Sequence, residues 1–181
     1  ANSRKIAFNK AGFGSDWRQK IKYSTTESSV QSLVDFAKEH HLENLVMVDN
    51  TASKDFVKHY PTFVDNGFDI VGSNKIYNTL PISEYRNFRK LLEKNKKKYL
   101  YETNVGAGLP LIDTIKLLHL SGENITRIKG VFSGTLSYVF NNFSLRNDKF
   151  STIINEALEK GYTEPDPRED LSGNDVARKL L

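Results

Sequence analysis

Acidic side chains crowd the stretch from Gly161 to Lys179, which ends on a lysine. The carboxylates are Glu164, Asp166, Glu169, Asp170 and Asp175. Pro165 and Pro167 lack N–H donors and fix φ, so they predict an extended or turning loop in the first half. A pocket that binds an ammonium group with carboxylates and transfers a proton with a lysine uses these residue types. The usual alternative for an acidic segment is a solvated loop with a surface ion pair, but such a loop needs no proline bracing.

The pattern becomes helical after Gly173. Asp175 and Lys179 are four residues apart, so on a helix they share one face, with Cβ atoms roughly 5–6 Å apart. Val176 and Leu180 form an apolar stripe beside them. We therefore expect a carboxylate and a lysine side by side where the acidic loop meets this helix.

Residues 161–179 closely resemble the catalytic signature of homoserine dehydrogenase. From residue 99 to 181 the resemblance is nearly continuous, and it includes Asn104-Val-Gly-Ala-Gly-Leu-Pro110 and Phe132-Ser-Gly-Thr-Leu-Ser-Tyr138. It implies an NAD(P)-dependent oxidoreductase that interconverts L-aspartate 4-semialdehyde and L-homoserine, in threonine and methionine biosynthesis. The spacing also resembles the homoserine dehydrogenase portion of bifunctional aspartokinase–homoserine dehydrogenases.

The resemblance implies a role for several residues of the substrate pocket. Lys179 would donate a proton to the substrate oxygen as hydride arrives, and Lys75 would polarise the carbonyl or share the proton relay. The ammonium group would be bound by Glu164, with help from Asp170 and Asp175. The other implied substrate contacts are Thr135, Gly161 and Tyr162.

The resemblance also implies a cofactor site and a cation site. Thr51 would line the nicotinamide side and Lys75 would lie between cofactor and substrate, while Ser3 and Arg4 would lie near the adenosine ribose. Arg4 there would suit NADP, although the choice between NAD and NADP stays open. A monovalent cation such as sodium would be held by Glu102 and by the backbone of Val105, Ala107 and Leu109.

Spacing alone favours simpler readings of these residues. Thr51 would be a loop cap, Lys75 a solvated side chain, and Thr135 part of an ordinary helix N-cap. The stretch after Glu102 would be a simple strand-to-helix turn. One departure from the family pattern is Ile76, where a second lysine usually follows Lys75.

The first half reads as part of a doubly wound α/β sheet. Its periodicity predicts helices at 17–22, 27–39 and 54–66, and buried parallel strands at 44–49 and 68–71. Ligands of such sheets bind beyond the carboxyl ends of the strands, where loops 49–53 and 72–75 lie. The G-x-G-x-x-G phosphate fingerprint has no good match, because Gly106-Ala-Gly108 lacks the third glycine. We therefore expect residues 1–80 to be a Rossmann-like cofactor domain without its first strand and Gly-rich loop.

The second half, residues 81–181, is predicted to be an α+β substrate and dimerisation domain with an open sheet, truncated at its C-terminus. The expected helices are 83–95, 110–120, 133–143 and 151–160, and the expected strands are 99–102 and 126–132. Exposed sheet edges favour a homodimer through this domain. Without a phosphate loop, the chain alone is expected to be inactive.

Composition limits the other possibilities. The 181 residues carry a net charge of +4 and no cysteine, which excludes disulfides and thiolate chemistry. No signal peptide or membrane-length apolar run is present, so we expect a cytoplasmic protein without a membrane partner. The lysines at 94 and 96–98 fit a solvated helix end, and no nucleic-acid partner is expected. The alternatives are a non-enzymatic basic α/β binding or regulatory module, and another amino-acid semialdehyde dehydrogenase.

Overall fold

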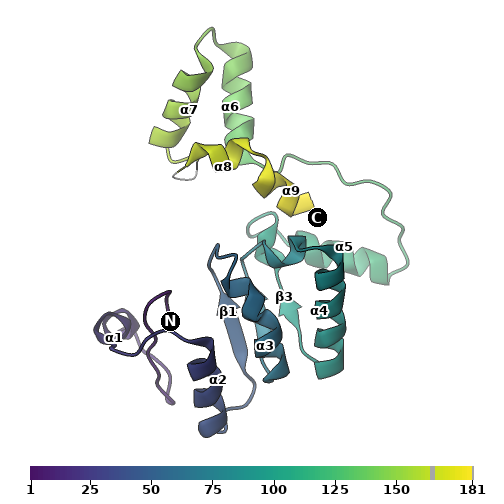
Figure 1. The fold of residues 1–181 in the computed structure, drawn as a ribbon. Coiled ribbons are helices and arrows are strands. Elements are labelled where there is room, and N and C mark those ends of the chain that lie inside the picture. Colours follow the sequence, from purple (N-terminus) through teal and green to yellow (C-terminus); the bar gives the residue numbers. More distant parts are fainter. Residues whose placement is uncertain (164–165, 181) are drawn as a thin grey trace.

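The structure, a computed structural model, describes residues 1–163 and 166–180. Glu164, one of the predicted ammonium ligands, lies outside the described residues. Figure 1 shows a small sheet with helices beside it and a helical hairpin above the sheet. The last two helices, α8 Pro167–Leu171 and α9 Asn174–Leu180, lie between the hairpin and the sheet.

The sheet consists of three parallel strands in the order β1-β2-β3. They are β1 Val46–Asp49, β2 Asp69–Gly72 and β3 Tyr99–Leu100. The two predicted strands of the first half are confirmed within two residues. The third is shorter than predicted, because Glu102–Asn104 turn into the 3-10 helix η3. All three strands end at the same edge, and the loops after β1 and β2 lie there.

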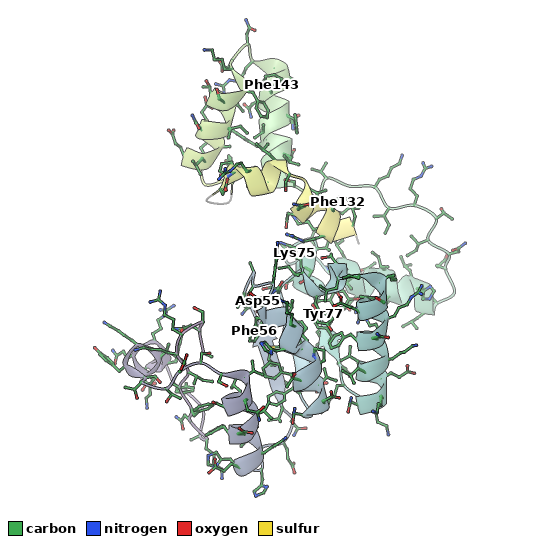
Figure 2. The ribbon with its side chains drawn as sticks, in the orientation of Figure 1. Asp55, Phe56, Lys75, Tyr77, Phe132 and Phe143 are labelled. Atoms are coloured by element: carbon green, nitrogen blue, oxygen red, sulfur yellow. The ribbon has the colours of Figure 1, made fainter. Side chains whose placement is uncertain are left out.

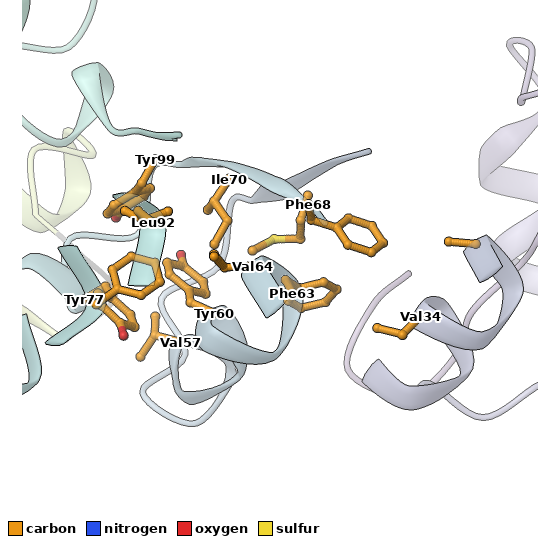
Figure 3. Packing of buried hydrophobic residues seen from close by; sticks show 13 residues of the cluster. Val34, Val57, Tyr60, Phe63, Val64, Phe68, Ile70, Tyr77, Leu92 and Tyr99 are labelled. Atoms are coloured by element: carbon orange, nitrogen blue, oxygen red, sulfur yellow. The ribbon is translucent and has the colours of Figure 1, made fainter. Parts of the chain in front are cut away.

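The main hydrophobic core lies between this sheet and the helices beside it (Figure 3). These helices are α2 Val30–Glu39, η1 Phe56–His59, α3 Tyr60–Asp65, η2 Tyr77–Thr79 and α4 Ile82–Asn95. Val57, Tyr60 and Phe63 are fully buried at its centre, and Phe56 is partly buried against it. Phe63 packs edge-on against Phe68, with ring centroids 5.3 Å apart. Side chains of α4 and β3 belong to this same core, so residues 82–100 pack with the first half of the chain. The domain division at residue 80 stays a prediction.

The remaining helices lie outside this main core. α1 Trp17–Tyr23 lies near the N-terminus, and α5 Leu111–Leu120 follows η3. α6 Gly134–Leu145 and α7 Phe150–Glu159 form the hairpin, around a small core of Val139, Ile153 and Ala157. Ser133 caps α6 by accepting from the Leu136 N–H, and Gly161 with φ +71° follows the end of α7. α8 Pro167–Leu171 and α9 Asn174–Leu180 complete the described chain.

Three expectations for the second half are wrong. Residues 126–132 are extended and mostly exposed but form no strand, because no other described segment pairs with their backbone. The described residues of 81–181 therefore do not form the predicted open sheet, and α5 has no buried residue. The proline-braced stretch is not loop throughout, since Pro167 begins α8, where a missing N–H costs nothing. No helix in the described part of the chain is long and apolar enough to cross a membrane.

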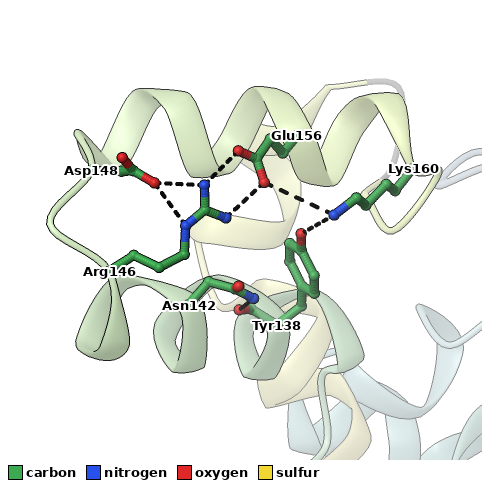
Figure 4. A network of polar contacts seen from close by, with 6 residues as sticks. All are labelled: Tyr138, Asn142, Arg146, Asp148, Glu156 and Lys160. Atoms are coloured by element: carbon green, nitrogen blue, oxygen red, sulfur yellow. Dashed lines mark hydrogen bonds and ion pairs between the residues drawn. The ribbon is translucent and has the colours of Figure 1, made fainter.

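A polar network joins the two helices of the hairpin (Figure 4). Arg146, just after α6, donates two hydrogen bonds of 2.8 Å to the Glu156 carboxylate on α7. Lys160 donates to the Tyr138 hydroxyl at 2.8 Å. Tyr138 in turn packs against Tyr162, with centroids 4.8 Å apart. The network thus fixes the end of α7, from which the acidic stretch begins.

Glu156 is expected to titrate below the ordinary range of a glutamate. Its hydrogen bonds from Arg146 lower the pKa of the Glu156 carboxyl, outweighing the opposite effect of desolvation. The contribution of the ionised Glu156 carboxylate to the stability of the fold is therefore complete above the ordinary pKa of a glutamate. It is lost as the pH falls through the lowered pKa. Carboxyl-carbon NMR titration should show this low midpoint, and Arg146→Met should raise it while Arg127→Met should not. An ordinary midpoint in the unmodified protein would contradict the network.

Candidate active site

Lys75, Asp175 and Lys179 meet above the carboxyl ends of the strands. Lys75 lies in the loop after β2 (Figure 2), and Asp175 and Lys179 both belong to α9. Lys75 Nζ lies 2.9 Å from Asp175 Oδ1, and Lys179 Nζ lies 2.6 Å from Asp175 Oδ2. One carboxylate therefore bridges two lysines that are 104 positions apart in sequence (179 minus 75). Sequence reasoning predicted these three residues for one site, and the structure brings them into contact.

The Lys179 ammonium has a second partner. Its Nζ donates to the backbone carbonyl of Phe132 at 2.7 Å, and the side chain is only 20% exposed. An ammonium has three N–H donors, so two are used and one is left for a ligand oxygen. Sequence reasoning missed Phe132, because a backbone carbonyl carries no signal in residue type.

Asp175 is held in its ionised form. Burial raises the pKa of this carboxyl, but hydrogen bonds and charge interactions with Lys179 and Lys75 outweigh burial and leave the pKa below its ordinary value. A carboxylate offers about four acceptor positions, so an ammonium ligand can share Asp175 with the two lysines. With one negative and two positive charges, the three side chains together carry a net positive charge that suits a carbonyl or carboxylate oxygen.

A second group of predicted residues gathers at the N-terminus of α6. The Thr135 hydroxyl lies within hydrogen-bond distance of the Tyr162 carbonyl and of Asp170 Oδ1, 3.1 Å away. Gly161 supplies the left-handed turn that leads into Tyr162, whose side chain is half exposed. Thr135 is thus not just part of an N-cap, since Ser133 performs the capping and Thr135 ties α6 to α8.

The predicted cofactor residues are divided between two places. Thr51 lies in the loop after β1, where its hydroxyl accepts from the Ser53 N–H at 3.2 Å and from Asn74 Nδ2 at 3.4 Å. This loop therefore adjoins the one that carries Lys75. Ser3 and Arg4 lie exposed on the N-terminal segment, and no hydrogen bond joins them to Thr51 or Lys75 in the described chain.

Glu102 acts as a helix cap in the structure. Its two carboxylate oxygens accept from the N–H groups of Ile112 at 2.8 Å and Asp113 at 2.9 Å, in the first turn of α5. In the segment between Glu102 and α5, Gly106 and Ala107 both have positive φ. A Cβ on Gly106 would lie 2.4 Å from a Leu111 methyl carbon, so this position has no space for a side chain. The Leu109 carbonyl already accepts from the Leu111 N–H. The Glu102 carboxylate oxygens and the Leu109 carbonyl oxygen each keep a lone pair that a weakly held cation could use. The cation site stays a prediction.

An open groove of about 720 Å³ lies along residues 128–133, α6 and α9. Its walls are mostly apolar, and Val176 and Leu180 line it from α9. None of the predicted site residues lines this groove. Lys179 donates a hydrogen bond to the carbonyl of Phe132, one of the lining residues.

Comparisons with known proteins show the family of the chain. Residues 3–102 match the family model described as the NAD-binding domain of homoserine dehydrogenase, and residues 110–181 match the homoserine dehydrogenase model. The chain is 43% identical to a bifunctional aspartokinase/homoserine dehydrogenase of Buchnera aphidicola, with 100% of this chain but 22% of that protein covered.

Two solved structures are also similar. A Candida auris protein of unknown function has a TM-score of 0.83 at 33% identity, with 98% of this chain and 51% of that chain covered. A hyperthermophilic archaeal homoserine dehydrogenase in complex with NADPH has a TM-score of 0.70 at 26% identity, covering 86% of this chain and 46% of that one. Since the NAD-binding model alone covers more than half of its 181 residues, the chain belongs to the homoserine dehydrogenase family.

Proposed function

We propose that the chain is part of an NAD(P)-dependent dehydrogenase that interconverts L-aspartate 4-semialdehyde and L-homoserine. The observation that carries this proposal is the contact of Lys75 and Lys179 with one carboxylate, beyond the carboxyl ends of parallel strands, where ligands of such sheets bind. The chain spans about a fifth of the curated relative's length, so the activity is that of a longer protein.

Lys179 is proposed as the proton donor. A bound nicotinamide would supply hydride to the aldehyde carbon. Lys179 releases one proton to the aldehyde oxygen, so that the carbonyl becomes an alcohol and the ammonium becomes an amine. Asp175 and the Phe132 carbonyl hold the other two N–H groups and so direct the third toward the substrate. Asp175 also favours the charged lysine, which makes Lys179 a weaker acid, and a substrate ammonium beside Asp175 offsets this effect.

Lys75 is proposed to lie between cofactor and substrate. From the loop after β2 it reaches the carbonyl oxygen as a second cation, and Asp175 keeps it there. Thr51 in the neighbouring loop would line the nicotinamide side, with Ser3 and Arg4 near the ribose. The NADPH complex of the archaeal relative supports NADP as one cofactor of this chain.

The substrate's ammonium group is proposed to bind where the acidic stretch meets α6. Asp170, fixed by the Thr135 hydroxyl, and Asp175 supply carboxylates from α8 and α9, with Glu164 as the third. Gly161 and Tyr162 shape the entry to this pocket. A sodium-like cation at Glu102 and the carbonyls of Val105, Ala107 and Leu109 would stabilise the turn into α5.

A homodimer through the second half is proposed as the assembly. Large apolar side chains are exposed there, among them Leu117 at 66%, Leu120 at 81% and Val131 at 81%. Such patches are typical of surfaces that become covered. We also propose that the chain divides into a cofactor domain, residues 1–80, and a substrate domain, residues 81–181. The protein is proposed to be cytoplasmic and to bind neither nucleic acid nor a membrane.

The complete protein should oxidise NADPH when L-aspartate 4-semialdehyde is added, as followed by the nicotinamide absorbance. The longer homologue, glutamate 5-semialdehyde, should support much slower turnover, because the ammonium and the carbonyl would no longer match the two ends of the pocket. The 181-residue chain alone should show little turnover. A clear preference for the longer semialdehyde would mean that the protein is a different amino-acid semialdehyde dehydrogenase. Turnover by the 181-residue chain alone would show that catalysis needs no further segments.

A further inference from the structure

Asp49 is a buried carboxylate that the mechanism above does not use. It is the last residue of β1, is 1% exposed, and forms no ion pair with any described residue. Burying a charge is unfavourable unless hydrogen bonds compensate it. Here Oδ1 accepts from the Thr51 N–H at 2.7 Å, and Oδ2 accepts from the Tyr60 hydroxyl at 2.8 Å and Asn74 Nδ2 at 3.1 Å.

These donors come from three different elements. Thr51 belongs to the loop after β1, Tyr60 begins α3, and Asn74 belongs to the loop after β2. The Asp49 backbone carbonyl also accepts from the Ser73 N–H at 2.9 Å. Asp49 therefore connects both loops at the sheet edge to the helix that supports them.

Asn74 passes this connection on to Lys75. It is 2% exposed, its Nδ2 also lies 3.2 Å from the Ser53 carbonyl, and its Oδ1 accepts from the Ile76 N–H at 3.1 Å. The backbone on both sides of Lys75 is thus fixed, while the Lys75 side chain stays available for Asp175.

Tyr60 is suited to remain a donor at every working pH. Burial, with the hydrogen bond to Asp49, raises the pKa of its phenol far above the ordinary value. Gly72 leaves room for this hydroxyl, since a Cβ there would lie 3.2 Å from it. A side chain at the end of β2 would therefore press against this hydroxyl.

We propose that Asp49 is a positioning residue that sets the place of Lys75 relative to Thr51, and with it the spacing of substrate and nicotinamide. It touches neither ligand and acts through Asn74 and the two loops. This inference rests on the proposed function, because it needs Lys75 to act on the substrate.

The test is a double-mutant cycle in the complete enzyme, with kcat/KM for the semialdehyde as the readout. Tyr60→Phe and Asp49→Asn should each lower kcat/KM by roughly 10-fold or more, the size of one hydrogen bond to a charged group. In a Lys75→Ala background the same changes should lower it by less than about threefold, because their effect passes through Lys75. A purely structural role would give equal factors in both backgrounds and would overturn the proposal.

Tyr77→Phe is the matched control. Tyr77 is a buried tyrosine stacked on Tyr60 at 4.8 Å, and it makes no hydrogen bond to Asp49 in the described chain. Tyr77→Phe should leave kcat/KM within about twofold of the value for the unmodified enzyme. A loss of kcat/KM equal to that of Tyr60→Phe would overturn the proposal. If Asp49→Asn does not fold, the nearly isosteric Tyr60→Phe cycle decides alone. An unmodified enzyme without activity on the semialdehyde would instead refute the proposed function.

Discussion

Replacing Lys179 with alanine in the complete enzyme is expected to lower kcat by roughly 10²–10⁴-fold, the range for loss of a positioned general acid. The cofactor dissociation constant should change little, because the polar partners of the Lys179 ammonium among the described residues are Asp175 and the Phe132 carbonyl, and neither is proposed to bind the cofactor. The loss should appear mainly in kcat and not in substrate affinity, since the proton is needed only in the transition state.

Lys20→Ala is the matched control for this substitution. Lys20 on α1 pairs with Asp16, the N-cap of that helix, at the same four-residue spacing, with 3.6 Å between Nζ and Oδ2. Figure 1 shows α1 at a distance from the sheet. Lys20→Ala should leave kcat within about twofold, as exposed pairs of this kind contribute little. Near-normal turnover of Lys179→Ala, measured in single-turnover reduction of the semialdehyde, would exclude Lys179 as the donor. Lys75 would then be the remaining candidate.

The local part of the site could be predicted from the sequence. Asp175 and Lys179 form an ion pair because residues four apart on a helix face each other, and this holds wherever the helix lies. To predict the contact between Lys75 and Asp175, one must also expect that a loop at the sheet edge and a helix distant in sequence lie together. The resemblance supplied that expectation, since spacing alone favoured a solvated Lys75.

Other features depend on tertiary structure that residue types do not encode. The alternation in residues 126–132 is typical of a strand, but a strand forms only where another backbone pairs with it, and no described segment does so. The acceptor for Lys179 is a backbone carbonyl, which any residue at position 132 would supply. Asp49 reads as the start of a polar loop, and only the packing of α3 reveals that its carboxylate is buried.

Phe63→Ala is expected to destabilise the sheet and its helices by about 3–5 kcal/mol, the usual effect of removing a buried phenylalanine ring. Phe63 is 0% exposed and contacts the rings of Phe56 and Phe68, with centroids 6.1 and 5.3 Å away. It lies one turn beyond Tyr60 on α3, so a cavity here also loosens the helix that holds Asp49. Part of the effect should therefore appear as weaker NADPH binding.

Hydrogen exchange of the amides of Met47 and Ile70 measures this change, because it reports the free energy of opening of β1 and β2 locally and needs no two-state unfolding of a large protein. Phe143→Ala is the control, since that ring is 46% exposed and lies on the α6–α7 hairpin, where it contacts Phe150. It should leave the exchange of both strands unchanged. A change below about 1 kcal/mol for Phe63→Ala would mean that the surrounding side chains close the space left by the ring, which the close packing of Phe56 and Phe68 against it should prevent.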